Sequence, residues 1–199
     1  MQAVEYKLIE DPQARAFCEC GTQVRLPAVS GYADLLKLHK SAQAGNFRTK
    51  GMKRNFPGYS QALSEIRKGS KQSHWIWYIW PSLAVIRPKV RFPEFLLPNF
   101  EASVAYYEDR LLLNRLLEIS RSASTHLKNG IAPEVLFGKQ HKYDAAKFQE
   151  TTTLFALIAF LKENLELSNE FGESSFRVAG SLHLPTVELV TEYLCTLIK

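Results

Sequence analysis

The stretch Gly69-Ser70-Lys71-Gln72-Ser73-His74-Trp75-Ile76-Trp77-Tyr78-Ile79-Trp80-Pro81 decides how the rest of the chain must be arranged. It holds all three tryptophans of the protein, together with a histidine and a tyrosine. An amphipathic surface helix has one polar face, whereas this segment is apolar or aromatic on every face. We therefore expect the segment to be buried on most sides, with any remaining side lining a cleft.

Helical patterns lie on both sides of this segment. Before it, apolar residues at i, i+3, i+4 and i+7 from Tyr59 predict an amphipathic helix between Pro57 and Gly69. The same kinds of cap and stripe predict further helices over residues 30–43, 99–128 with a break near 108–109, 132–138, 144–165 and 185–197. These patterns predict an all-α protein, a compact single domain of about six or seven helices.

The N-terminal residues 1–29 follow a different pattern. Apolar and polar residues alternate in two short runs, 4–8 and 23–26, and this predicts a short β-hairpin. We therefore divide the chain into an N-terminal extension, 1–29, and a helical domain, 30–199.

Positive charge is concentrated in one part of the sequence. The formal net charge is +5, but the segment from Lys37 to Arg91 carries twelve Lys or Arg residues and a single acid, Glu65. Residues 44–58 form a predicted basic loop with no apolar face, and its cations are Arg48, Lys50, Lys53 and Arg54. Such a segment suits an anionic small molecule or the backbone of RNA or DNA. The alternative is that basic and acidic helices pack together and leave no coherent patch.

Composition limits the class of protein. Hydrophobic residues make up 46% of the chain and charged residues 23%, which is typical of a globular protein. The apolar runs are too short to cross a bilayer. Three cysteines make no disulfide framework, and the Cys18-Glu19-Cys20 pair lacks the second pair that a zinc site needs. We expect an intracellular, cytoplasmic protein with no metal, no cofactor and no membrane contact.

His74 is the strongest candidate for a working side chain. An imidazole beside indole rings in a half-buried cleft can be tuned for acid or base chemistry, and Glu65 and Asp144 are the candidate partners. The candidate ligand-binding residues are basic, hydroxyl or aromatic side chains near His74 or on the helix predicted to start at Asp144: Arg67, Lys68, Lys71, Ser73, Trp75, Trp77 and Lys147. The structural alternative is that His74 and the tryptophans only fill the core, and that Asp144 and Lys147 lie on a solvated first turn.

Several strings resemble one bacterial family, the domain-of-unknown-function family eighteen-ten, often labelled calpastatin. They are Leu38-His39-Lys40-Ser41-Ala42-Gln43, the run 59–69, the run 71–81, Ala105-Tyr106-Tyr107, Leu113-Asn114-Arg115-Leu116 and Thr153-Leu154-Phe155. The resemblance covers about residues 31–199 and implies a compact, mostly helical domain, with no established substrate, reaction or cofactor. This chain departs from the family pattern at three places: the basic stretch 44–58, Ser82 in place of a glutamine, and Glu150-Thr151 in place of a serine pair.

Three functions stay open at this point. The first is a pocket around the Ser-His-Trp-x-Trp string that binds, and could hydrolyse, an anionic nucleotide-like ligand. The second is a module that binds an RNA or DNA backbone through the basic segment 37–91, which includes the basic loop. The third is a structural or interaction protein. The sequence has no G-x-S-x-G, H-E-x-x-H or P-loop string, which disfavours serine hydrolases, zinc proteases and nucleoside triphosphatases. It leaves open whether the protein is an enzyme, and in what oligomeric state.

Overall fold

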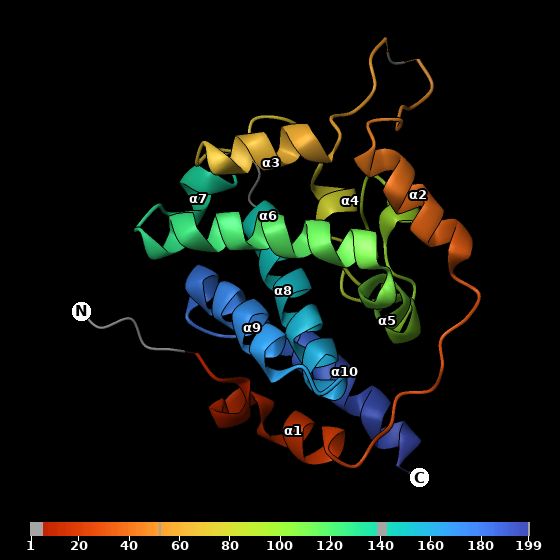
Figure 1. Ribbon diagram of the computed structural model, residues 1–199, viewed down its shortest axis with the longest axis vertical. Helices are drawn as coiled ribbons and strands as arrows, with labels where there is room; N and C mark the ends of the chain where they lie inside the picture. Colours follow the sequence, from red (N-terminus) through yellow and green to blue (C-terminus); the bar gives the residue numbers. More distant parts are fainter. Residues whose placement is uncertain (1–5, 52, 139–142, 199) are drawn as a thin grey trace. The chain divides into compact units, whose positions relative to one another are not determined.

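The computed structural model describes residues 6–51, 53–138 and 143–198. These residues contain ten α-helices, three 3₁₀ helices and no β-strand, so the predicted all-α class is confirmed (Figure 1). The chain divides into two compact units, Val29–Lys147 and a second unit formed by Met1–Ala28 with Phe148–Lys199. Among the helices that the structure describes, we find no candidate for a membrane span.

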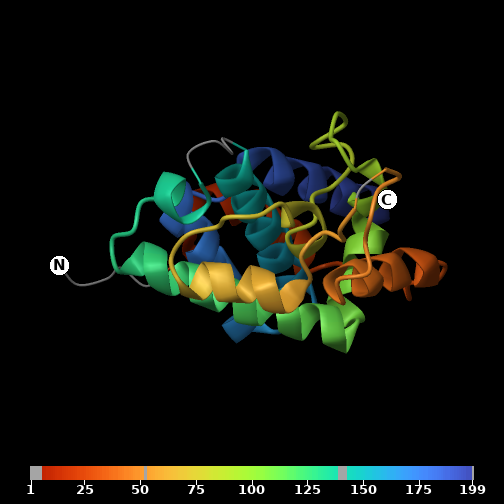
Figure 2. The same cartoon turned by 90° about the horizontal axis from the view of Figure 1, so that it is seen from above.

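The unit of residues 29–147 is built around one long helix. Its elements are α2 (Ala33–Gln43), α3 (Tyr59–Arg67), α4 (Ile76–Ile79), η3 (Pro93–Phe95), α5 (Phe100–Glu108), α6 (Arg110–Lys128), α7 (Pro133–Leu136) and the first turn of α8 (Asp144–Leu161). Helices α3, α5 and α7 all pack against α6, and α3 lies alongside it in both views (Figures 1 and 2). The predicted break before α6 is confirmed, because Asp109 accepts a hydrogen bond from Leu112 N and caps the new helix.

The aromatic segment is mostly interior, as predicted. Trp75, Tyr78 and Trp80 are buried, whereas Trp77 is only half-buried. The two buried indole N–H groups both have acceptors: Trp80 donates to Ser120 Oγ at 3.0 Å and Trp75 to Glu65 Oε2 at 2.8 Å. Such partners are needed because a buried indole N–H without one would lose the hydrogen bond it makes to water.

A histidine lies in the same core. His39 on α2 has no exposed surface, and its ring meets those of Phe95 and Tyr106 edge-on, with centroids 5.5 and 5.2 Å away. Its Nδ1 lies 3.5 Å from the carbonyl oxygen of Tyr78. Burial lowers the pKa of His39 to about 4, against the opposing effect of the backbone carbonyls of Tyr78 and Phe95. His39 is therefore neutral at neutral pH.

The second unit joins the two ends of the chain. It contains η1 (Leu8–Glu10), η2 (Pro12–Ala14), α1 (Arg15–Gly21), most of α8, α9 (Leu165–Ala179) and α10 (Leu184–Leu197). Every residue from 148 to 159 of α8 is buried, as expected for a helix without a polar face. Tyr6 packs its ring against Gly172 of α9, and α1 packs against α10.

The β-hairpin predicted near the N-terminus is wrong for the residues that the structure describes; residues 1–5 lie outside them. Asp11 accepts a hydrogen bond from Gln13 N at 2.7 Å, and Pro12 occupies the first position of η2. A capping aspartate followed by proline starts a helical turn, and this local preference prevails over the short alternation. The division into an extension, 1–29, and a domain, 30–199, stays a prediction.

Candidate functional site: a basic pocket beside the aromatic segment

The loop that leads into the aromatic segment is held by one carboxylate. Glu65, on α3, accepts hydrogen bonds at Oε2 from the backbone N–H groups of Gln72 (2.9 Å) and Ser73 (3.0 Å), and from Trp75 Nε1 (2.8 Å). Its Oε1 accepts from Ser73 Oγ and, at 3.2 Å, from Gln61 Nε2. Backbone amides, a hydroxyl and an indole from residues 72–75 therefore all donate hydrogen bonds to one carboxylate.

These contacts determine the charge of Glu65. Burial raises its pKa, but the hydrogen bonds from Ser73 Oγ, Gln72 N, Trp75 Nε1 and Ser73 N together lower it below the ordinary value for a glutamate. A carboxylate that is ionised and saturated with donors is a poor proton donor. The geometry therefore favours a structural role for Glu65 over the acid–base role that the sequence suggested.

A pocket of about 430 Å³ opens beside the half-buried Trp77. Its lining, here called the basic pocket, is made of Trp77, Arg87, Lys89, Val90, Arg91, Tyr143, Asp144 and Lys147. The volume falls within the range of small-molecule sites. Two of the lining side chains, Asp144 and Lys147, are buried, whereas Lys89, Arg91 and Tyr143 are exposed. The pocket therefore has a charged interior and a rim of cations with one tyrosine.

The side chains that line the basic pocket include more cations than acids. Asp144 is its single acid, and Asp144 Oδ2 lies 2.8 Å from Lys71 Nζ in an ion pair whose side chains are 9% and 1% exposed. Lys71 Nζ also lies 5.3 Å from the centre of the Trp75 ring. The lining therefore counts four cations against one carboxylate, and that carboxylate lies beside a further cation, Lys71.

The aromatic wall of the pocket is Trp77. Lys147 Nζ lies 5.6 Å from the centre of the Trp77 ring, within the range of a cation–π contact. His74 is exposed, and its ring lies 6.4 Å from that of Trp77 and within 25° of parallel. Phe92 meets Trp77 edge-on at 4.5 Å and fixes its orientation. His74 is therefore one ring away from the pocket, and its exposure does not fit the alternative in which it only fills the core.

Other predicted residues lie elsewhere. Arg67 is exposed and pairs with Glu118 at 2.8 Å, and Lys68 is exposed at the C-terminal end of α3. Ser73 and Trp75 belong to the set of donors to Glu65. None of these four lines the basic pocket.

The basic loop projects from an aromatic base. Its four cations, Arg48, Lys50, Lys53 and Arg54, are all exposed. At the base, Phe56 N donates to Phe47 O at 2.8 Å, and the two phenyl rings stack with centroids 5.2 Å apart. The ring of Phe56 also lies edge-on to that of Trp77, with the ring centroids 6.0 Å apart. The base of the loop thus rests on the indole that forms the wall of the pocket.

Sequence reasoning did not select Arg87, Lys89, Arg91 and Tyr143 as site residues. A usable signal was present, since Arg87, Lys89 and Arg91 occupy alternate positions between closely spaced prolines, where the chain cannot form a helix. Arg87 also lies over the ring of Tyr143 at 5.6 Å. No pattern in the sequence predicts this contact, because Arg87 and Tyr143 lie more than 50 positions apart.

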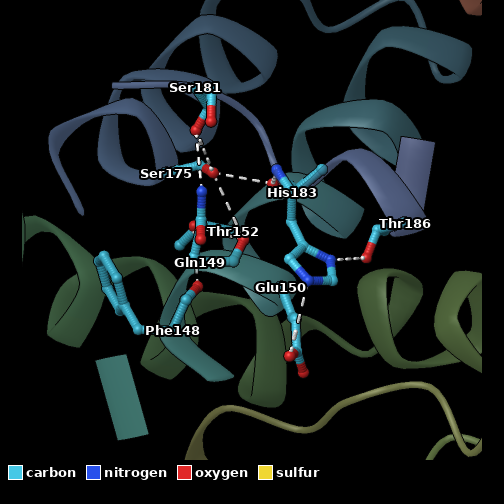
Figure 3. A network of polar contacts seen from close by, with 9 residues as sticks. Phe148, Gln149, Glu150, Thr152, Ser175, Ser181, His183 and Thr186 are labelled. Atoms are coloured by element: carbon cyan, nitrogen blue, oxygen red, sulfur yellow. Dashed lines mark hydrogen bonds and ion pairs between the residues drawn. The ribbon is translucent and has the colours of Figure 1, made fainter. Parts of the chain in front are cut away.

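A separate polar network ties α8 to α9 and α10 in the second unit (Figure 3). Thr153 Oγ1 accepts from His183 N at 2.9 Å and lies 2.8 Å from Ser175 Oγ. His183 Nδ1 lies 2.9 Å from Thr186 Oγ1, and its Nε2 lies 3.8 Å from Glu150 Oε1. These contacts satisfy buried polar atoms along α8 and explain how its hydroxyl-rich part can be interior.

Metal binding finds no support in the described parts of the chain. Residues 6–51, 53–138 and 143–198 contain no group of three or more His, Cys, Asp or Glu side chains that could hold an ion.

Fold and site together define a class: a small helical protein with a cationic, aromatic-walled pocket next to a buried Lys–Asp pair. Residues 34–168 match the family described as "Protein of unknown function (DUF1810)", and the chain belongs to this family, which confirms the resemblance of its sequence strings. The chain is also similar to the crystal structure of the conserved hypothetical protein Rv1873 from Mycobacterium tuberculosis. That likeness has a TM-score of 0.59 and 24% identity, and it covers 77% of this chain and 94% of the other. It concerns the fold alone. A comparison with curated proteins finds no match.

Proposed function

We propose that this protein binds a small anionic molecule that carries both a phosphate group and an aromatic ring, such as a nucleotide, in the basic pocket. One observation carries the proposal: four cations and an indole ring line a single pocket in which the one acid, Asp144, lies beside Lys71. Cations gathered along a pocket attract an anion and raise its local concentration there.

The cations suit a phosphate in two ways. Arg87 and Arg91 on the rim have planar guanidinium groups that can donate two parallel hydrogen bonds to phosphate oxygens. Lys147 is buried in the lining, where a charge–charge interaction is screened less than at the surface. The rim would therefore orient the phosphate, and Lys147 would contribute most of the attraction per charge.

The aromatic lining suits a flat ring. Trp77 is half-buried and stands in the wall, and Tyr143 is 68% exposed at the rim. Stacking of a base on an aromatic side chain contributes about 1–3 kcal/mol per base. Trp77 is held by Phe92 and Phe56, so little ordering is needed when a ring binds.

If the bound molecule is cleaved at a glycosidic or phosphate linkage, His74 is the group we assign as acid or base. It is exposed and lies parallel to Trp77, so a ring stacked at the pocket wall would bring its linkage near the imidazole. Asp144 is the other candidate, because it lines the pocket and its Oδ2 lies 2.8 Å from Lys71 Nζ.

The test measures binding by calorimetry with AMP, ADP, NAD, ADP-ribose and inorganic phosphate. We expect a ring-bearing phosphate to bind, and the double variant Arg87→Gln/Arg91→Gln to bind it at least about tenfold more weakly, since each charged hydrogen bond is worth about 1.5–3 kcal/mol. Arg48→Gln/Arg54→Gln removes the same charge from the basic loop and is the matched control, expected to bind normally. Equal affinity of the two double variants, or no binding by any of these compounds, contradicts the proposal.

A second candidate function is binding of a single-stranded nucleic acid through the basic loop. The observation that favours it is the set of four exposed cations carried on an aromatic base. Short RNA should then bind with a steep salt dependence, and Arg48→Gln/Arg54→Gln should weaken it while Arg87→Gln/Arg91→Gln has the smaller effect. The opposite ranking of the two double variants contradicts this candidate.

A further inference from the structure

Two cysteines that lie far apart in the sequence face each other in the second unit. Cys20 on α1 and Cys195 on α10 have their Sγ atoms 3.5 Å apart, and both are free thiols. A disulfide needs an S–S distance of about 2.05 Å, so the sulfur atoms must approach by about 1.5 Å. A shift of this size lies within the reach of side-chain rotation when the two helices are already in contact.

The helices are held in this arrangement by close packing. Gly21 follows Cys20, and a Cβ atom at Gly21 would lie 2.9 Å from Leu161 Cδ2 and 3.2 Å from Phe160 Cε1. Phe17 packs against Phe160, with ring centroids 5.4 Å apart. Helix α1 therefore packs closely against α8, and it also packs against α10, which places Cys20 beside Cys195.

Solvent reaches this pair from the side of Cys195. Cys195 is exposed, and it lines a shallow, largely apolar hollow of about 390 Å³ beside α10, with Ala16 and Val187 among the other lining residues. Cys20 is half-buried, and its hydrogen bond with Cys195 is the main cause of a raised pKa. Cys195 is therefore the sulfur that a small oxidant meets first.

We propose that Cys20 and Cys195 are a redox modification site that closes into a reversible intramolecular disulfide when a peroxide reaches the hollow. The thiol of Cys195 releases its proton as its sulfur attacks one peroxide oxygen, the O–O bond breaks, and the departing hydroxide takes up that proton, so that a sulfenic acid and water form. The sulfur of Cys20 then attacks the Cys195 sulfur, the S–O bond breaks, and the hydroxyl leaves as water with the proton of Cys20. In sum, two thiols and one hydrogen peroxide give one disulfide and two waters.

The third cysteine provides the control. Cys18 is two residues from Cys20 and so points away from it on the helix. Its Sγ lies 3.9 Å from the carbonyl oxygen of Leu8, and burial, together with Asp11 and Glu19, raises the pKa of this thiol to about 11. Cys18 is thus unreactive by comparison and has no part in the proposed bond.

The experiment treats the full-length protein with a small excess of hydrogen peroxide at neutral pH and then counts free thiols under denaturing conditions. We expect the wild type and Cys18→Ser to lose two thiols each, with no dimer on a non-reducing gel. Cys20→Ser and Cys195→Ser should form no intramolecular disulfide. Dithiothreitol should restore every thiol.

Two further measurements keep the test decisive even if a serine variant folds poorly. Mass spectrometry of the oxidised wild type should identify one peptide pair joined through Cys20 and Cys195. The oxidised protein should melt about 5–10 °C higher than the reduced one, because the bond closes most of the chain into a loop. Recovery of a Cys18–Cys20 bond, an intermolecular bond or sulfinic acids in place of this pair overturns the proposal.

Discussion

The buried His39 makes the stability of the protein depend on pH in a calculable way. The pKa of its imidazole is lowered to about 4 in the folded protein, against about 6.5 in an unfolded chain. Between these values the unfolded chain binds a proton that the folded protein does not, so stability is complete above pH 6.5 and falls as the pH drops toward 4. This one group should remove about 2.5 kcal/mol of the free energy of unfolding between pH 7.5 and pH 4.5.

Urea unfolding followed by tryptophan fluorescence at several pH values measures this loss. His39→Gln keeps a side chain able to donate to the Tyr78 carbonyl but takes up no proton, so its free energy of unfolding should fall by about 2.5 kcal/mol less than that of the wild type over the same range. His74→Gln changes an exposed histidine and is the control, expected to follow the wild type. Parallel pH profiles for the wild type and His39→Gln would refute the assignment of a neutral, buried imidazole.

Three further substitutions test the contacts that shape the molecule. Glu65→Gln turns two amide hydrogens toward the donors that surround Glu65, so we expect a loss of about 2–4 kcal/mol in urea unfolding and faster amide exchange in the loop that it holds. Lys71→Met leaves the Asp144 carboxylate buried without its cation, at a cost of about 3–5 kcal/mol, and adding Asp144→Asn should recover part of it; a double variant no more stable than Lys71→Met would contradict the ion pair. In Gly172→Ala, the new Cβ would lie 2.1 Å from Tyr6 Cε1, and this clash should outweigh the gain in helix propensity of about 1 kcal/mol. A melting temperature above that of the wild type would show that the Tyr6 ring moves aside freely.

The elements that sequence reasoning predicted are those with strong local signals. The helix ending near Gly69, the break before α6 and the short α7 each have a cap, a proline or a glycine at the expected place. The sequence pattern does not predict helix α9, because Gly172 and the serines of this helix interrupt its apolar stripe. Its start depends on Asn164, which accepts a hydrogen bond from Leu167 N at 3.0 Å. The sequence pattern does not predict helix α1 either, because a helix of seven residues is stabilised mainly by its tertiary contacts.

The sequence predicts which residues are buried less well than it predicts where helices begin and end. On α2, the apolar residues Leu35, Leu36 and Leu38 are only half-buried, while the polar residues His39 and Gln43 are interior. His39 can be buried because its ring packs against Phe95 and Tyr106 and lies near the carbonyl oxygen of Tyr78. These partners lie about 40 to 70 positions later in the sequence. No window of local sequence contains that information.

Some residues of the candidate site are predictable from the sequence and others are not. Trp77, Asp144 and Lys147 were selected from the sequence, and the structure places them around one pocket. Their functional roles stay predictions. Arg87 and Arg91 complete the pocket through an irregular segment whose path is set by tertiary packing, so spacing alone could not assign them.

The carboxylate of Glu65 changes how the Ser-His-Trp string should be interpreted. Ser73 and Trp75 are both required as donors to that one acceptor, so a chain that places a glutamate there needs those two residue types for folding alone. His74 stands between them, and its ring lies beside that of Trp77. Hydrogen bonding to one carboxylate thus accounts for the first and third residues of the string. Anyone who transplants this string into another scaffold must therefore transplant the glutamate with it.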